Sequence, residues 1–285
     1  MRTTATVVES PAREHPKVTL RQEFERVHVL GIALDVAGLD SAADAVIDGA
    51  RAGRSASVCA VNVHSTMEAS RDSALLSALQ ASDLNVPDGV PIVWGMRALG
   101  APKQQRVFGP TLMWEVCRRA AESGVPIALY GSTDETLAML QAALVTAFPA
   151  LHIVAAISPP FRLLFGAEDE GMVLRLNASG ARIVFVGLGA PKQEKWMAAH
   201  RGRVSAVMLG VGAAFDYHVG RIRRAPVWMQ HAGLEWLYRL IQDPRRLWRR
   251  YIFNNPAYLV RLGTQILRSR VLRREPRGRQ GGIDG

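Results

Sequence analysis

Cysteine is scarce in this chain of 285 residues, and no long uninterrupted hydrophobic run is present. Cys59 and Cys117 lie within apolar segments and lack the spacing of a CxxC pair. They exclude a disulfide framework and fit buried thiols in a reducing cytoplasm. No stretch approaches the ~20 apolar residues that a membrane-spanning helix needs, so we expect any membrane contact to be peripheral.

Metal-binding and dinucleotide-binding signatures are also missing. The sequence has no DxD motif and no histidine cluster at metal-ligand spacing, which predicts no metal site. Gly210 and Gly212 follow a strand-like run, but Phe215 stands where the GxGxxG fingerprint needs its next glycine. This disfavours a Rossmann oxidoreductase, which remains an alternative. The first residues lack the apolar core of a signal peptide, and we expect residues 1–25 to form a disordered leader.

Positive charge is present but unevenly distributed. The net charge is +10, and the segment from Arg221 to the end holds 15 arginines, no lysine and four acids, a balance of +11. The rest of the chain therefore carries 20 basic and 21 acidic residues, a balance of −1. A nearly neutral body with a strongly basic end predicts an anionic partner, such as lipid headgroups, nucleic acid or a diphosphate.

From Val27 onward, short β-branched runs alternate with amphipathic stretches at the spacing of βα units. This pattern predicts an α/β fold with a mostly parallel, Rossmann-like sheet flanked by helices. The expected strands are Val27–Ile32, Ser57–Val61, Leu84–Val86, Ile127–Tyr130, Ile153–Ile157, Ile183–Val186 and Ala206–Leu209. The expected helices are Ser41–Ala52, His64–Gln80, Thr111–Ser123, Asp134–Ala147, Asp169–Ser179 and Pro191–His200.

The amino-acid composition changes after Val219, where Trp, Tyr, Leu and Arg become frequent. We therefore divide the chain into a catalytic domain over 26–219 and a C-terminal appendage over 220–272. The appendage predicts two helices, Ala225–Gln242 and Pro244–Leu267, in which aromatic and arginine residues alternate. Such helices favour an interfacial membrane contact, although aromatics that pack on the body beside solvated arginines would give the same pattern. Residues 273–285 are rich in Arg and Gly and predict a disordered tail.

Polar groups follow several expected strands, where ligands of parallel α/β sheets bind. Asn62 closes one strand, Asp88 lies on a Pro/Gly-shaped turn, and Arg106 precedes a helix. Gly187 and Gly189 form a turn before a helix that carries Gln193. Each has a simpler interpretation: Asp88 as a turn or capping residue, Arg106 as a surface charge, and the glycines as a tight turn.

In combination and in this order, the segments resemble the WecG/TagA/CpsF glycosyltransferases over roughly Val29 to Leu262. The segments are VPDGVPIVW, R-V-x-G-P-x-L, A-L-Y-G-S, V-G-L-G-A-P-K-Q-E-x-W, L-G-V-G-A-A-F-D and R-A-P-x-W-x-x-x-x-G-L-E-W-L-Y-R-L. The resemblance implies an inverting transferase that acts on undecaprenyl-diphosphate-linked intermediates of cell-surface polysaccharides and works without a bound metal. We expect no cofactor.

Position by position, the resemblance implies that Asp88 is the general base, Asn62 belongs to the donor pocket, and Arg106 is an active-site arginine. Gln193 corresponds to a glutamine near the nucleotide. Where several relatives have Thr-x-Asn, this chain has Ala60 two residues before Asn62, so one hydroxyl is missing and the identity of the sugar is left open.

The chemistry of the residues agrees with such roles. A sugar hydroxyl has a pKa far above neutral, so its attack benefits from a nearby carboxylate. A departing nucleotide diphosphate needs positive charge, and without a metal site arginine is the substitute, because its planar fork pairs with phosphate. Arg106 and the group Arg221, Arg223 and Arg224 are the candidates.

The expected partners are a nucleotide-sugar donor (a UDP-hexose or UDP-N-acetylhexosamine), a polyprenyl-diphosphate-linked acceptor and the anionic inner leaflet of the plasma membrane. A nucleic-acid-binding protein that uses the arginine-rich tail is the second alternative, against which the large α/β body and the aromatic-rich basic helices count. We expect no nucleic acid partner. A homo-oligomer is compatible with the sequence, which leaves the oligomeric state open.

Overall fold

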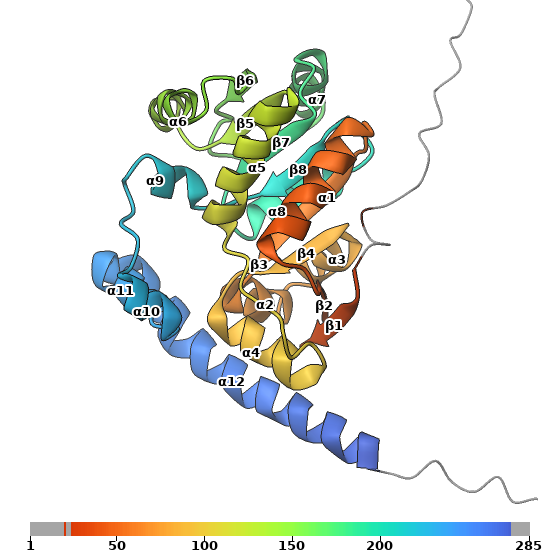
Figure 1. Ribbon diagram of the computed structural model, residues 1–285, viewed down its shortest axis with the longest axis vertical. Coiled ribbons are helices and arrows are strands. Elements are labelled where there is room, and N and C mark those ends of the chain that lie inside the picture. Colours follow the sequence, from red (N-terminus) through yellow and green to blue (C-terminus); the bar gives the residue numbers. More distant parts are fainter. Residues whose placement is uncertain (1–19, 21–23, 275–285) are drawn as a thin grey trace, which may run out of the picture.

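The computed structural model describes Leu20 and residues 24–274, and Figure 1 shows their arrangement. A six-stranded parallel sheet forms the centre, with strand order β4-β3-β8-β7-β5-β6. Its strands are β3 (Ala56–Val61), β4 (Leu84–Pro87), β5 (Ile127–Gly131), β6 (Ile153–Ile157), β7 (Ile183–Gly187) and β8 (Val207–Gly210). The prediction of an α/β fold with a parallel sheet and flanking helices is confirmed.

Helices cover both faces of this sheet, so the central strands are buried on two sides (Figure 1). Along β7, Ile183 and Phe185 enter one core cluster while Val184 and Val186 enter the other. This burial explains the nearly continuous apolar runs that predicted the strands. The helices of the body are α1 (Leu39–Arg51), α2 (Val63–Ala69), α3 (Ser73–Ala81), α4 (Val90–Leu99), α5 (Gly109–Ser123), α6 (Asp134–Ala147), α7 (Ala167–Ala178), α8 (Lys192–His200) and α9 (Ala214–His218).

The first expected strand, Val27–Ile32, is wrong as a single element. Two short antiparallel strands, β1 (Arg26–Val29) and β2 (Ile32–Asp35), form a hairpin there. The chain reverses at Leu30 and Gly31, both at positive φ (49° and 87°). A leucine gives no signal for such a turn, because non-glycine residues rarely adopt this backbone conformation. The prediction relied on the apolar run alone and therefore joined β1 and β2 into one strand.

The expected helix His64–Gln80 is also divided. α2 ends at Ala69, and α3 begins after Asp72, whose side chain accepts a hydrogen bond from the Leu75 N–H at 3.1 Å. Aspartate is a preferred helix N-cap, since its oxygen pairs with an amide that the helix leaves free. The new cap starts a second helix, so α2 and α3 can take different directions.

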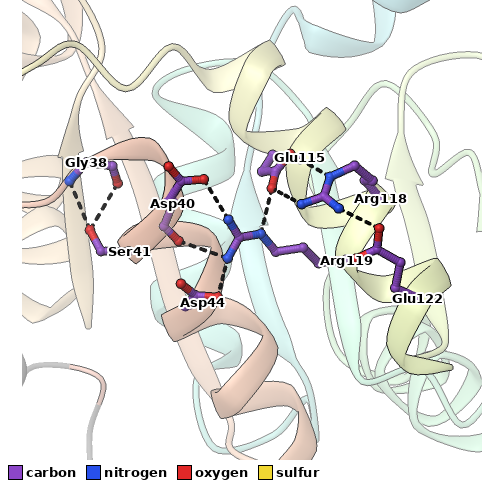
Figure 2. A network of polar contacts seen from close by, with 8 residues as sticks. All are labelled: Gly38, Asp40, Ser41, Asp44, Glu115, Arg118, Arg119 and Glu122. Carbon is purple, nitrogen blue, oxygen red and sulfur yellow. Dashed lines mark hydrogen bonds and ion pairs between the residues drawn. The ribbon is translucent and has the colours of Figure 1, made fainter.

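A charged network joins the neighbouring helices α1 and α5 (Figure 2). Arg119 of α5 donates to Glu115 and to Asp40 of α1, at 2.6 and 2.7 Å, and also pairs with Asp44. Arg118 donates to Glu115 as well. These pairs hold the pKa of the Glu115 carboxyl down at about 2, with the hydrogen bond from Arg118 as the largest cause.

The C-terminal segment folds into α10 (Val227–His231), α11 (Glu235–Gln242) and α12 (Pro244–Arg274). The expected single helix Ala225–Gln242 is wrong, because Gly233, at φ +72°, separates α10 from α11. The long helix α12 is confirmed and continues past the expected end at Leu267. It runs along the side of the body formed by α2 and α4 (Figure 1).

Helix α12 is anchored to the body by specific contacts. Tyr258 and Leu262 are buried in the core, and the Tyr258 hydroxyl donates to the Pro91 carbonyl at 3.1 Å. The Gln265 side chain pairs with the β1–β2 hairpin through the Leu30 N–H and the His28 carbonyl. Helix α12 of the C-terminal segment therefore packs directly on the α/β body.

The ends of the chain lie largely outside the described residues. Most of the expected leader, residues 1–25, is among the residues not described, although the side chain of Leu20 is buried in the core. Residues 275–285 of the expected tail are likewise not described. Across the part of the chain that the structure describes, no helix is long and apolar enough to cross a membrane.

Candidate active site

Asn62 and Asp88 lie at the carboxyl ends of two neighbouring parallel strands, β3 and β4. The Asp88 N–H donates to the Val61 carbonyl at 2.7 Å, which extends the strand pairing into the turn. The Asn62 side chain accepts from the Ser65 N–H at 3.1 Å and so caps α2. The sheet thus fixes the backbone of both residues at one edge, where α/β folds bind ligands.

A cavity of about 110 Å³, called here the Asp88 cavity, opens at this edge. Its body side contains three of the residues proposed from the sequence, Asn62, Asp88 and Arg106. Its other side comes from the C-terminal helices α11 and α12. The lining residues from those helices include Glu235, Trp236, Arg239, Arg250, Tyr251 and Asn254.

Arg106 joins the two sides of the Asp88 cavity. One guanidinium nitrogen lies 3.4 Å from Asp88 Oδ1, and another donates to Glu235 Oε2 at 2.5 Å. The guanidinium also lies over the Phe108 ring, 4.3 Å from its centroid. A cation stacked on an aromatic ring and held by two carboxylates has a fixed orientation, which suits it to a charge that develops during a reaction.

Burial raises the pKa of the Asp88 carboxyl above its ordinary value. Arg106 opposes this shift, whereas the negative charge of Glu235 adds to it. Burial alone would lower the pKa of Arg106, but Asp88 and Glu235 raise it, so this arginine stays charged. The site therefore combines a carboxylate of increased basicity with a permanent cation.

His64, at the start of α2, also lines the Asp88 cavity. Burial, followed by the charges of Arg250 and Arg71, lowers its pKa to about 4. Its ring is therefore neutral at neutral pH. Its Nδ1 lies 3.4 Å from the Asn254 amide of α12, a contact that ties the C-terminal helix to the site.

A second cavity, of about 380 Å³, is also lined by Arg106 and Phe108. Arg224, one of the proposed substrate-binding residues, lines it, and its guanidinium lies 5.3 Å from the Phe108 centroid. Arg97 of α4 lines the same space. Because Val90, Arg106 and Phe108 line both cavities, the two spaces are adjacent.

Gly187, Gly189 and Gln193 lie at the same sheet edge but line neither of these two cavities. A Cβ on Gly187 would come within 2.6 Å of the Phe215 ring, so this glycine permits close packing. The Gln193 oxygen accepts from the Gly212 N–H and its nitrogen donates to Glu194, both at 3.0 Å. The Gln193 amide is therefore oriented by the two turns that follow β7 and β8.

Arg221 is held away from the Asp88 cavity. It pairs with Glu135 of α6 at 2.8 Å, and it lines neither cavity. The two arginines proposed together from sequence proximity, Arg221 and Arg224, thus have different surroundings. Only Arg224 joins the cavity system that contains Arg106.

Sequence reasoning missed the residues that α11 and α12 contribute, above all Glu235, Arg239 and Arg250. Glu235 stands 129 positions after Arg106, so no local spacing relates the two. One signal was available: Glu235 is one of only four acids in a segment with 15 arginines. A buried carboxylate in such a segment needs a cationic partner, which Arg106 provides.

Metal ligands do not gather near this site. Among the described residues, no group of three or more His, Cys, Asp or Glu side chains could hold a metal ion. The positive charge at the Asp88 cavity comes from guanidinium groups, namely those of Arg106, Arg239 and Arg250. Arginine pairs with phosphate through parallel hydrogen bonds, so these side chains are suited to phosphate oxygens.

The fold is of the α/β class, and it brings a buried carboxylate and several guanidinium groups to the carboxyl ends of its parallel strands, where such folds bind ligands. A buried carboxylate beside a guanidinium suits the transfer of a group from a phosphorylated donor. Residues 27–272 match the model of the glycosyl transferase WecG/TagA/CpsF family. The chain belongs to this family, and membership supports a glycosyltransferase role in cell-surface polysaccharide synthesis, with a nucleotide-sugar donor and a lipid-linked acceptor.

Proposed function

We propose that this protein is an inverting, metal-independent glycosyltransferase that moves a hexose or N-acetylhexosamine from a UDP-sugar to a polyprenyl-diphosphate-linked saccharide. The observation that carries this proposal is the pairing of Asp88 with Arg106 at the carboxyl ends of β3 and β4. Family membership supports the reaction class and leaves the sugar and the linkage to be determined.

Asp88 acts as the general base. Its carboxylate takes the proton of an acceptor hydroxyl while that oxygen attacks the anomeric carbon of the donor. The new glycosidic bond forms as the bond from the anomeric carbon to the UDP oxygen breaks, so the proton ends on Asp88 and the electron pair on UDP. Because burial raises the pKa of Asp88, this carboxylate is a better proton acceptor than an ordinary one.

Arg106 stabilises the negative charge of the leaving diphosphate. Its guanidinium is oriented by Glu235 and by the Phe108 ring before any substrate binds. A preorganised cation stabilises developing charge without reorganisation at the moment of reaction. We expect transfer activity to survive treatment with EDTA, and a strict requirement for Mg²⁺ or Mn²⁺ in the same assay would contradict this role.

The donor is proposed to contact Asn62 and the turn that contains Gly187, Gly189 and Gln193. All four residues lie at the carboxyl edge of the sheet, where β3 and β7 end. Gly189 adopts a positive φ of 77°, a conformation that lets backbone amides face a ligand. Arg224, which lines the second cavity, is proposed to contact a substrate phosphate, and Arg221 is proposed to do so by exchanging its Glu135 partner for phosphate.

The C-terminal appendage, residues 220–272, is proposed to dock on the anionic inner face of the plasma membrane. Helix α12 has two apolar faces. One, with Leu247, Tyr251, Tyr258 and Leu262, is buried against the protein. The other is exposed and carries Phe253, Val260 and Leu267 at seven-residue spacing, which places them on one side of the helix.

The exposed face of α12 has arginines beside it. Arg249, Arg261, Arg268 and Arg270 are exposed on the same helix. Exposed apolar residues flanked by arginines match the requirements of a helix that lies in a membrane interface. Each basic residue near an anionic leaflet contributes about 1 kcal/mol of attraction, so several support reversible binding.

A panel of nucleotide sugars with a short-chain polyprenyl-diphosphate saccharide tests the proposal. We expect one UDP-sugar to be turned over, with inversion at the anomeric carbon seen by NMR of the product. Turnover with retained configuration would contradict the single displacement at Asp88. Failure of every donor would contradict the proposed substrate pair.

A further inference from the structure

The larger of the two cavities, about 380 Å³, does not contain the proposed base. It is called here the Arg224 cavity. Ligand pockets in proteins commonly span about 300–1,000 Å³, so it is large enough for a substantial group. It shares the Arg106–Phe108 wall with the Asp88 cavity. A molecule that fills it would lie directly beside the reacting centre.

The charged residues that line the Arg224 cavity are all arginines. Arg97, Arg106 and Arg224 line it, and no Asp or Glu does. Arg97 donates through Nε to the Gln104 carbonyl at 2.8 Å, which orients the guanidinium, and within the described residues neither Arg97 nor Arg224 has a carboxylate partner. Arg106 is balanced by Asp88 and Glu235, whereas Arg97 and Arg224 add two guanidinium groups without a carboxylate partner among the residues that the structure describes, which predicts an anionic ligand with more than one charge.

Helix α5 adds a further favourable group. This helix of 15 residues begins at the cavity, where Phe108 is its N-cap and provides no side-chain hydrogen bond. Thr111 of its first turn also lines the cavity. Free amides and the helix dipole favour negative charge at an N-terminus, and they add to the charges of Arg97 and Arg224.

The remaining wall is apolar. Val90, Val93 and Trp94 of α4 line the cavity, and the Trp94 side chain is 49% exposed. A large exposed aromatic beside a cationic pocket is suited to a ligand that joins an apolar group to a phosphate. The lining thus has two chemically distinct parts, one for phosphate and one for hydrocarbon.

We propose that the Arg224 cavity binds the diphosphate of the lipid-linked acceptor, with the first isoprene units against Trp94 and Val93. This inference rests on the proposed function, because an acceptor whose diphosphate lies in the Arg224 cavity would have its sugar in the adjacent Asp88 cavity, next to the proposed base. A nucleotide donor has a diphosphate but no hydrocarbon to cover the apolar wall. The glycine turn proposed for the donor also lies outside this cavity.

Binding of substrate fragments tests the assignment without turnover. Isothermal titration calorimetry of the full-length protein would use farnesyl diphosphate, inorganic pyrophosphate and UDP as separate probes. The variants are R97Q/R224Q, R224Q alone and W94A. R224Q is the variant less expected to disturb folding. Within the described residues, the Arg224 side chain contacts the Phe108 ring and makes no hydrogen bond. R51Q/R175Q, two exposed arginines away from both cavities, is the charge-matched control.

We expect R97Q/R224Q to weaken farnesyl diphosphate binding by about tenfold or more while UDP binding changes less than about twofold. W94A should weaken farnesyl diphosphate more than pyrophosphate, and the control should change neither. Loss of UDP binding with farnesyl diphosphate unaffected would assign the cavity to the donor and overturn the proposal. Unchanged binding of all three probes would also overturn it. If the protein instead binds farnesyl diphosphate as expected but transfers no sugar, the proposed function fails and the diphosphate site stands.

Discussion

Asp88 is subject to opposing electrostatic influences within one small cavity. Burial and the nearby Glu235 raise the pKa of its carboxyl, whereas Arg106 and Arg239 lower it. The net shift is upward. Since a general base must be deprotonated, kcat/KM should fall as the pH decreases through this pKa, at a higher pH than an ordinary aspartate would give.

The variant Glu235→Gln tests this balance. Removing the negative charge of Glu235 eliminates one cause that raises the Asp88 pKa and leaves the Arg106 charge less neutralised. Both changes favour the ionised form, so the acid limb of the kcat/KM profile should move to lower pH. An unchanged limb, or one at higher pH, would show that Asp88 is not the titrating base.

The sequence predicted that Asn62 and Asp88 would lie close together, because polar residues that follow neighbouring parallel strands share one edge. Arg106 follows helix α4 and not a strand, so its place in the site was predicted from the family resemblance. It did not predict Glu235, since a contact across 129 positions leaves no periodic signal. Nor did it separate Arg221 from Arg224, which are close in sequence but face Glu135 and Phe108 respectively. Side-chain direction after an irregular turn cannot be inferred from spacing.

Elements are coupled by polar contacts as well as by the core, and the α1–α5 network in Figure 2 is the clearest case. Glu115 accepts hydrogen bonds from both Arg118 and Arg119. The folded-state pKa of Glu115 is about 2, below its ordinary 4.5. Its contribution to stability is therefore present above about pH 4.5 and is lost as the pH falls toward 2.

Glu115→Gln should lower the free energy of unfolding by about 1 kcal/mol at pH 7, with solvent screening limiting the effect. The difference from wild type should shrink as the pH approaches 2. Urea denaturation at several pH values measures this. Glu122→Gln on the same helix is the matched control, because Glu122 is exposed and, within the described part of the chain, its ion pair is with Arg118 alone. A penalty for Glu115→Gln that stays constant with pH would contradict the assignment.

The strands of the parallel sheet were predictable, because burial on both faces demands continuous apolar runs such as Ile183–Val186. The breaks in other elements were not found, although two had signals. Asp72 has the chemistry of an N-cap and Gly233 that of a helix terminator. At the Leu30–Gly31 turn the glycine was the single signal, and Leu30 gave none, since the contact of the hairpin with Gln265 supports its unfavourable backbone conformation.

At the scale of the whole molecule, the C-terminal helices connect the catalytic edge with an exposed apolar face. Glu235, Arg239 and Arg250 line the Asp88 cavity from one side of these helices, while Phe253 and Val260 face solvent. The sequence predicted the long helix α12, although it merged α10 and α11 into one helix. It could not predict that Tyr258 and Leu262 bury α12 against the body, because an aromatic-rich basic helix fits either a protein or a membrane surface.

The membrane proposal predicts that F253Q/V260Q weakens co-sedimentation with vesicles that contain anionic lipid. High salt should weaken binding of the wild type too, because the arginine attraction is screened. Turnover on a short-chain soluble acceptor should stay within about twofold of wild type, since these side chains face away from the cavities. V145Q/V154Q, which changes exposed valines of the body, is the matched control. Unchanged vesicle binding by F253Q/V260Q would contradict docking through this face.

The central claim is that Asp88 deprotonates the acceptor hydroxyl, and turnover by Asp88→Asn tests it most directly. The substitution keeps the shape of the side chain and removes its basicity. We predict a loss of about two orders of magnitude or more in kcat, with UDP binding and the unfolding midpoint nearly unchanged. Asp48→Asn, at an exposed site on α1, should behave as wild type. Near-normal turnover by Asp88→Asn would contradict the account and leave Asp88 as a turn residue.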